Sequence, residues 1–75
     1  MKTNYVNADE LMLQAQEAEA KKDFKGAAKS YEKIIKQQPT NETAFNRLMI
    51  MYRKQKLYAN ELRIIDKGVE NFRKF

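Results

Sequence analysis

The chain has no cysteine and no histidine, and its 75 residues include only one proline and two glycines. Without cysteine it can form no disulfide bond and no thiolate metal site, and without histidine the other usual transition-metal ligand is missing. General acid–base and nucleophilic catalysis draw heavily on the same two side chains. We therefore expect a protein that is not an enzyme and that uses neither a metal nor a cofactor.

Long apolar runs are also absent. The longest is residues 48–52, far shorter than the roughly 18–20 residues of a membrane-spanning helix. The N-terminus leads into no apolar segment of the kind found in signal peptides, so we expect a cytoplasmic protein without membrane contact. The formal net charge is +5, and most of the basic excess lies in residues 42–75. Such a surface favours anionic partners, although a solvated Lys-rich helical surface explains the same count.

The spacing of the apolar residues predicts four helices, over residues 8–21, 24–37, 42–55 and 58–73. The expected N-caps are Asn7, Asp23 and either Thr40 or Asn41, and Pro39 ends the second helix. Because the links are short, neighbouring helices must run antiparallel. The apolar stripes expected to pack are Leu11, Ala15 and Ala18; Phe24, Ala27, Ala28, Tyr31, Ile34 and Ile35; Phe45, Leu48, Met49 and Tyr52; and Leu62, Ile65, Val69 and Phe72.

The sequence repeats itself at an interval of 34 residues. The helices, the links and the apolar stripes coincide when the chain is shifted by this interval, and a period of 34 with two helices is typical of a helical repeat array. The matched pairs include Asn7 and Asn41, Leu11 and Phe45, Lys22 and Lys56, Phe24 and Tyr58, Tyr31 and Ile65, Glu32 and Asp66, and Ile35 and Val69.

This pattern resembles the tetratricopeptide repeat, whose consensus is Trp-x-x-Leu-Gly-x-x-Tyr, then Ala-x-x-x-Phe, then Pro. The first repeat matches at Leu11, Ala15, Ala27, Tyr31 and Pro39, and the second at Phe45, Leu48, Tyr52 and Ile65. The chain departs from the consensus at Gln14, Ala18, Met49, Glu61 and Arg73. Glu61 replaces a small alanine, which suggests looser packing of the last hairpin or the end of an array.

The resemblance implies an all-α fold of two antiparallel helix-turn-helix hairpins, stacked as a short right-handed α-solenoid. Residues 8–41 form the first repeat and residues 42–75 the second, after a frayed N-terminus at residues 1–7. They make one small domain, complete or part of a longer array. An ordinary antiparallel four-helix bundle is the alternative, since spacing alone does not exclude it.

In such arrays the first helix of each repeat lines a concave binding surface. The residues that the resemblance places there as partner-binding are Met12, Gln16, Asn46, Arg47, Ile50, Arg53 and Lys54, with Asp9, Leu13, Glu19 and Thr43 beside them. Arginine and asparagine hydrogen-bond carboxylates and peptide backbone, and Ile50 suits an apolar side chain. We therefore expect a protein or peptide partner with an acidic segment; a solvated charged face is the alternative.

Some members of this family grip a C-terminal carboxylate with Lys and Asn on successive first helices. Met12, Gln16 and Arg47 stand at the positions of that clamp. Since their side chains differ from those of the clamp, we do not predict that specificity.

A second candidate surface lies at the C-terminal end. No following helix covers the apolar residues there, so this face is a candidate for homodimer contact or for a capping helix. The alternative is that the two phenylalanines fold back onto the core. The residues of this face are Ile65, Val69, Phe72 and Phe75, with Ile64 beside them. Met12, Met49 and Met51 suggest an adaptable binding surface, with core filling as the alternative for Met49.

Nucleic-acid binding is the remaining alternative. Lys25, Lys29, Lys33 and Lys36 form a basic ridge on the second predicted helix, and Arg47, Arg53 and Lys54 form another on the third. Glu32 interrupts the first ridge, and no nucleic-acid motif is present. Nucleic acid is therefore not the partner that we expect.

Overall fold

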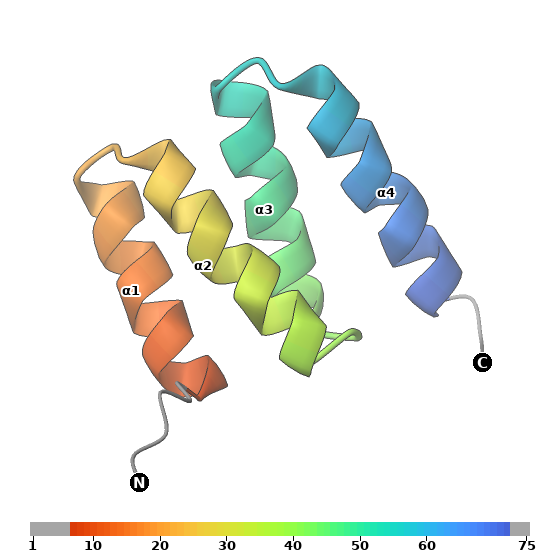
Figure 1. Cartoon of the computed structure of the whole chain (residues 1–75), viewed down its shortest axis with the longest axis horizontal. Helices are drawn as coiled ribbons and strands as arrows, with labels where there is room; N and C mark the ends of the chain where they lie inside the picture. Colours follow the sequence, from red (N-terminus) through yellow and green to blue (C-terminus); the bar gives the residue numbers. More distant parts are fainter. Residues whose placement is uncertain (1–6, 73–75) are drawn as a thin grey trace, which may run out of the picture.

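The computed structural model describes residues 7–72, with the backbone alone for residues 71 and 72. This range holds no strand and four helices: α1 (Ala8–Ala20), α2 (Phe24–Gln37), α3 (Glu42–Lys54) and α4 (Tyr58–Phe72). Each helix packs antiparallel beside the next, so the four form a row in chain order (Figure 1). The all-α prediction is confirmed, and the helix bounds differ from those predicted by at most one residue.

Two further expectations concern the chain ends and the membrane. Residues 1–6, which carry most of the predicted frayed N-terminus, lie outside the described residues. Between residues 7 and 72, no helix combines the length and the apolar character that a membrane span requires.

Three of the helices begin at a side-chain cap. Asn7 Oδ1 accepts a hydrogen bond from the backbone N–H of Glu10 at 2.9 Å, and Asp23 Oδ1 accepts one from the N–H of Gly26 at 3.0 Å. Asn41, rather than Thr40, caps α3 through the N–H of Ala44 at 3.0 Å. Each cap satisfies one of the N–H groups that a helix start leaves without a partner.

The same turn closes both hairpins. Lys22 (φ 63°) and Lys56 (φ 62°) adopt the left-handed conformation two residues after the last residue of α1 and of α3. Each of these lysines donates its N–H to the carbonyl three residues earlier, and the next residue donates to the carbonyl five residues before it, at 2.8–2.9 Å. This is the Schellman arrangement, which usually has glycine at the left-handed position. The turn geometry therefore repeats at the same interval of 34 residues as the sequence.

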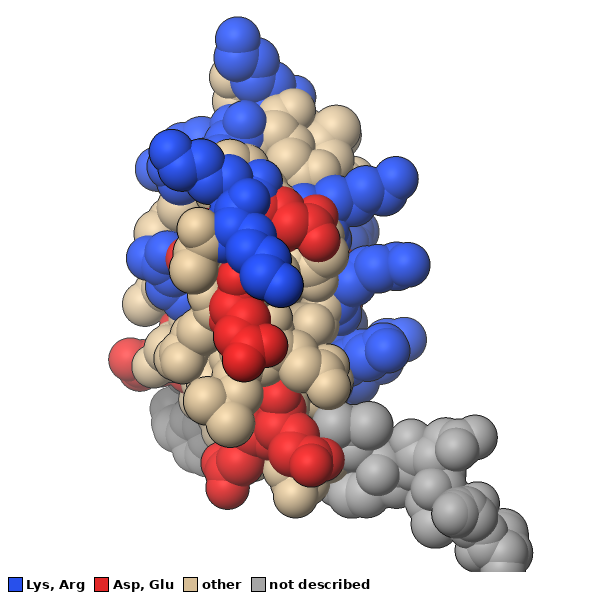
Figure 2. Space-filling model, turned by 90° about the vertical axis from the view of Figure 1, so that its left-hand side faces the viewer, with Lys and Arg blue, Asp and Glu red and all other residues tan. Residues whose placement is uncertain are grey.

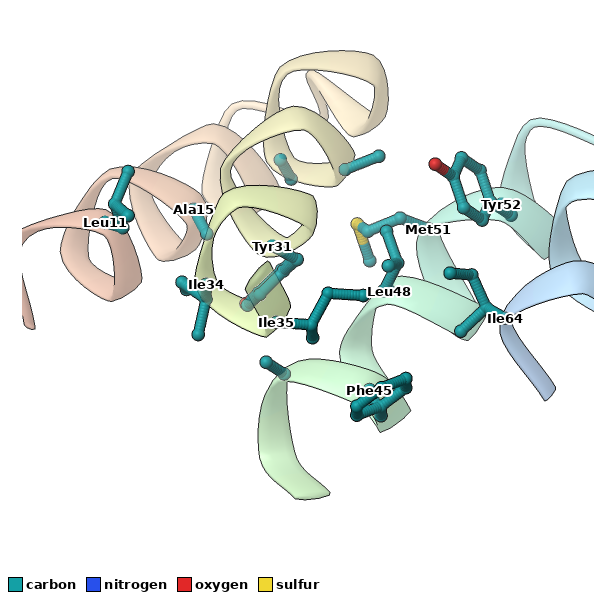
Figure 3. Close-up of a cluster of buried hydrophobic side chains, with 13 residues drawn as sticks. Leu11, Ala15, Tyr31, Ile34, Ile35, Phe45, Leu48, Met51, Tyr52 and Ile64 are labelled. Carbon is teal, nitrogen blue, oxygen red and sulfur yellow. The ribbon is translucent and has the colours of Figure 1, made fainter. Parts of the chain in front are cut away.

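The core runs along the row of helices rather than around a centre. Figure 3 shows Tyr31, Ile34 and Ile35 of α2 with Leu48 and Met51 of α3 in one buried cluster. The small residues of the first hairpin, Ala15, Ala27 and Ala28, are buried, and their size permits close approach of α1 and α2. Met51 is fully buried, so the expectation that it belongs to an adaptable binding surface is wrong.

The prediction of which face of α4 is buried is wrong. Leu62 and Val69 are 62% and 53% exposed, and Ile65 is half-buried. The face that packs on α3 is formed by Glu61, Ile64 and Gly68. Hydrophobicity alone favours the first stripe, because the second contains a charged residue and a glycine.

Two contacts explain why the less apolar stripe is the buried one. Arg53 donates to the buried carboxylate of Glu61 from Nε at 2.9 Å and from Nη2 at 2.6 Å. Gly68 lies against the Phe45 ring, which would stand 3.4 Å from a Cβ at this position. Glu61 is therefore paired rather than a mark of loose packing, and α4 approaches α3 closely at Gly68.

We predict that Lys56→Gly raises the free energy of unfolding by about 0.5–1 kcal/mol. Glycine removes the strain of the left-handed conformation in the folded state. It also increases the entropy of the unfolded chain, which offsets part of this stabilisation. Chemical denaturation measures the change. Lys22→Gly should have the same effect, and Lys29→Gly in the exposed middle of α2 should instead lower stability by about 1 kcal/mol. A loss of stability with Lys56→Gly would contradict the prediction.

Candidate functional site

A half-buried carboxylate on α1 joins three helices. Glu19 accepts hydrogen bonds from the Tyr31 hydroxyl of α2 and from the Arg47 guanidinium of α3, whose Nε lies 3.1 Å from Glu19 Oε2. Arg47 Nη2 also forms an ion pair with Glu19 Oε1. We call these three residues the Glu19 cluster. It links α1 to α3, two helices further along the row.

A second cluster has the same design one helix later. Glu32 of α2 accepts a hydrogen bond from the Tyr52 hydroxyl of α3 and, at 2.8 Å, from Arg63 Nη2 of α4. We call Glu32, Tyr52 and Arg63 the Glu32 cluster. In both clusters the carboxylate comes from one helix, the tyrosine from the next and the arginine from the one after. Each cluster therefore spans three consecutive helices.

The charges of both clusters shift the pKa values of their members. The Arg47 guanidinium lowers the pKa of the Glu19 carboxyl, and Glu19 in turn raises the pKa of Arg47. Burial, together with hydrogen bonds to the carboxylates, raises the pKa of Tyr31 and that of Tyr52 to about 12. These phenols therefore stay protonated and act as donors, which suits a structural role.

The α1–α3 surface is where the predicted partner-binding residues lie. Arg47 belongs to the Glu19 cluster, and Arg53 is paired with Glu61. The Lys54 ammonium lies 5.4 Å from the centre of the Phe24 ring, a distance typical of a cation–π contact. The three cations expected to receive an acidic segment thus already contact side chains of the same chain.

The other predicted residues of this surface differ in exposure. Gln16 and Asn46 are exposed, whereas Met12 and Ile50 are partly buried and pack against the core. Figure 2 looks onto the α1 end of the molecule and shows acidic side chains over the middle and lower part of that end, with basic side chains above them and along one edge. The exposed acidic residues of α1 include Asp9, Glu10 and Glu17.

An apolar groove opens between α3 and α4. Its volume is about 300 Å³, and its walls are almost entirely apolar. Of the predicted C-terminal face, Ile65 and Val69 line this groove, whereas the side chain of Phe72 and the whole of Phe75 lie outside the described residues. The lining residues are Phe45, Asn46, Met49, Ile64, Ile65, Gly68 and Val69.

A second groove, of about 390 Å³, crosses from α2 to the start of α4. All four lysines of the predicted basic ridge line it, and we call it the lysine groove. The Glu32 carboxylate lies among them, but its hydrogen bonds go to Tyr52 and Arg63. The lining residues are Lys25, Ala28, Lys29, Glu32, Lys33, Lys36, Tyr52, Gln55, Leu57 and Asn60.

The described residues contain no group of three or more acidic side chains arranged to hold a metal ion. Sequence reasoning missed both clusters, since the interval of 34 residues does not relate their members. At that interval, Arg53 corresponds to Glu19 and Ile65 to Tyr31. Only the placement of helices two apart in the row brings these side chains together.

Comparison with family models, with curated proteins and with solved structures finds no match for this chain.

We predict that alkaline pH destabilises the protein through Tyr31 and Tyr52. Their folded-state pKa of about 12 exceeds the ordinary value of 10.0, so the stabilisation is complete below pH 10 and is lost as the pH rises toward 12. Denaturation at several pH values, with the absorbance of tyrosinate followed in parallel, measures both effects. In the Tyr31→Phe, Tyr52→Phe variant, stability should fall less steeply over this range. Parallel curves for the two proteins would contradict the prediction.

Proposed function

We propose that this chain is a non-catalytic protein-interaction module that binds a segment of a partner protein. We further propose that its four helices are two tetratricopeptide-like repeats, stacked as a short right-handed α-solenoid. The equal turns at Lys22 and Lys56 and the row of antiparallel helices support this arrangement. A cytoplasmic location stays a prediction from the sequence.

The apolar groove is the observation that carries the proposal. A surface groove lined by aliphatic and aromatic side chains loses its contact with water when an apolar partner binds, which is the main driving force for association. The exposed side chain of Val69 lines it, and Leu62 extends the apolar surface of α4 beyond it. The α1–α3 surface gives the proposal weaker support, because its arginines already form ion pairs with Glu19 and Glu61. Asn46 is the predicted residue that belongs to the groove as well.

A selection from a displayed library of amphipathic peptides tests this function. We predict that Val69→Glu lowers the affinity of the selected peptides at least tenfold, because it places a charge in the apolar wall. Leu13→Glu is the matched control, since Leu13 is 61% exposed on α1, away from the groove. Because both residues are exposed, both variants should keep the helical circular-dichroism signal. Loss of binding with Leu13→Glu alone would move the site to the α1–α3 surface, and a selection without binders would contradict the function.

Self-association through the same apolar face is the alternative form of this function. Two copies that pair through Leu62, Ile65 and Val69 would bury it symmetrically. Sedimentation of the wild type and of Val69→Glu separates the two cases. If the wild type is a dimer through this face, its measured mass should fall to that of the monomer with Val69→Glu, and otherwise the two masses should be equal.

A second candidate function is the binding of an acidic protein segment in the lysine groove. Four exposed lysines along one wall of a groove attract anions, and such attraction weakens with salt. We predict that poly-glutamate binds to this groove, and that Lys29→Glu with Lys33→Glu abolishes the binding. Titrations at about 50 and 200 mM salt measure it, with a single-stranded oligonucleotide as the comparison. Tighter binding of the oligonucleotide would favour the nucleic-acid alternative instead.

A further inference from the structure

The apolar groove matches a surface that is already covered elsewhere in the same molecule. We propose that it binds an amphipathic helix of a partner protein, docked on α3 and α4 as α3 docks on α1 and α2. This inference rests on the interaction function proposed above, and it specifies the conformation, the apolar spacing and the charges of the bound segment.

The internal repeat supplies the template. Shifted back by 34 residues, five of the seven residues that line the groove fall on buried residues of α1 and α2: Leu11, Ala15, Tyr31, Ile34 and Ile35. The other two, Asn46 and Ile64, fall on the partly buried Met12 and Ser30. The difference is largest at one pair of matched positions. Ile35 is 2% exposed in the first hairpin, and its counterpart Val69 is 53% exposed. In the first hairpin α3 packs against this face, so a helix in the groove would give the second hairpin the cover that the first already has.

The stripe of α3 that packs on α2 indicates what such a helix must carry. Ala44, Leu48 and Met51 are fully buried, four and then three residues apart. One turn further on, Gln55 Nε2 donates to the carbonyl of Phe24 at 3.4 Å. The proposed partner helix therefore presents apolar residues at this same spacing, which lie on one face of a helix.

Two charged residues of α3 and α4 that do not line the groove would select the polar contacts of a docked helix. Asp66 takes the place of Glu32 in the repeat, and it is exposed and has no partner among the residues that the structure describes. Since Glu32 accepts a hydrogen bond from the Tyr52 hydroxyl, a tyrosine or arginine of the partner helix would donate one to the Asp66 carboxylate. Arg53 takes the place of Glu19, and its Nε and Nη2 are bound by Glu61. Because the Arg53 side chain is still 62% exposed, an acidic residue of the partner helix, where α3 has Arg47, would share it with Glu61.

The α1 helix of a second copy of this chain does not have the residues that such a helix needs. If α1 docked in the groove, the residues at the places of Ala44, Leu48 and Met51 would be Glu10, Gln14 and Glu17. All three are exposed and polar. Burying two carboxylates and an amide against an apolar wall without partners costs several kcal/mol, so end-to-end association of copies is disfavoured.

The probe is a peptide with the sequence of residues 41–57 and the substitution Arg47→Glu. The peptide keeps the apolar stripe and Tyr52. Its new carboxylate would meet Arg53 when the peptide docks on α3 and α4, but it would be repelled by Glu19 if the peptide displaced α3. We expect it to bind the full chain with a Kd on the order of 10–100 µM, because a short peptide must order on binding. The unsubstituted peptide should bind several times more weakly.

Fluorescence anisotropy gives the affinities, and backbone amide shifts give the location. We expect Val69→Glu in the protein to lower the affinity of the probe at least tenfold. The largest changes in backbone amide shift on binding to the wild type should be at Ile65, Gly68 and Val69. A probe that also carries Tyr52→Phe should bind less tightly to the wild type. For this Tyr52→Phe probe, Asp66→Asn in the protein should cause no additional loss of affinity, because the missing hydroxyl was the partner of the Asp66 carboxylate.

Three results would overturn the proposal. If the probe does not bind by about 1 mM while library-selected peptides still depend on Val69, the interaction function stands but the α3-like docking is wrong. Binding that neither Val69→Glu nor Asp66→Asn weakens would place the peptide elsewhere. If the wild type dimerises and Val69→Glu does not, the occupant of the groove is a second copy rather than a partner helix.

Discussion

Each helix in this molecule packs mainly against the helices before and after it in the chain, and the other features depend on that single row. An inner helix such as α2 or α3 has a neighbour on two sides and needs two apolar faces. An end helix has one neighbour and can bury only one face. The outward side of α1 is polar at Glu10, Gln14 and Glu17, whereas the outward side of α4 is apolar at Leu62 and Val69. The two ends of the row are therefore chemically different, and only one of them suits an apolar partner.

Helices two apart in the row share few backbone contacts, and long side chains connect them instead. Arg47 reaches Glu19 from α3 to α1, and Arg63 reaches Glu32 from α4 to α2. Both carboxylates are only partly exposed, so leaving either without its donors would be unfavourable. Because each carboxylate also receives a tyrosine hydroxyl from the helix between, the relative positions of three helices are coupled at each cluster. Such coupling resists sliding of one hairpin against the other.

Local chemistry made the helix bounds and caps predictable. Asn7, Asp23 and Asn41 cap helices through the N–H three residues later, a relation that depends on neighbouring residues alone. The face of α4 was not predictable from hydrophobicity, because Glu61 is buried only with Arg53 as its partner. The sequence predicted Arg47 and Arg53 to be available to a partner. It does not show that the fold brings the carboxylates of Glu19 and Glu61 within hydrogen-bond distance of them. Ile65 and Val69 were expected both in the packed stripe of α4 and in an uncovered apolar face, and the structure places them in the walls of the apolar groove.

The position of α4 at the end of the row also links binding to folding. A terminal helix held from one side can detach while α1, α2 and α3 keep their mutual contacts, so local opening there costs less free energy than global unfolding. The apolar groove exists only while α4 is docked on α3, since both helices supply its walls. A ligand in the groove would thus slow hydrogen exchange along α4, and its apparent affinity would be reduced by the fraction of molecules in which α4 is open.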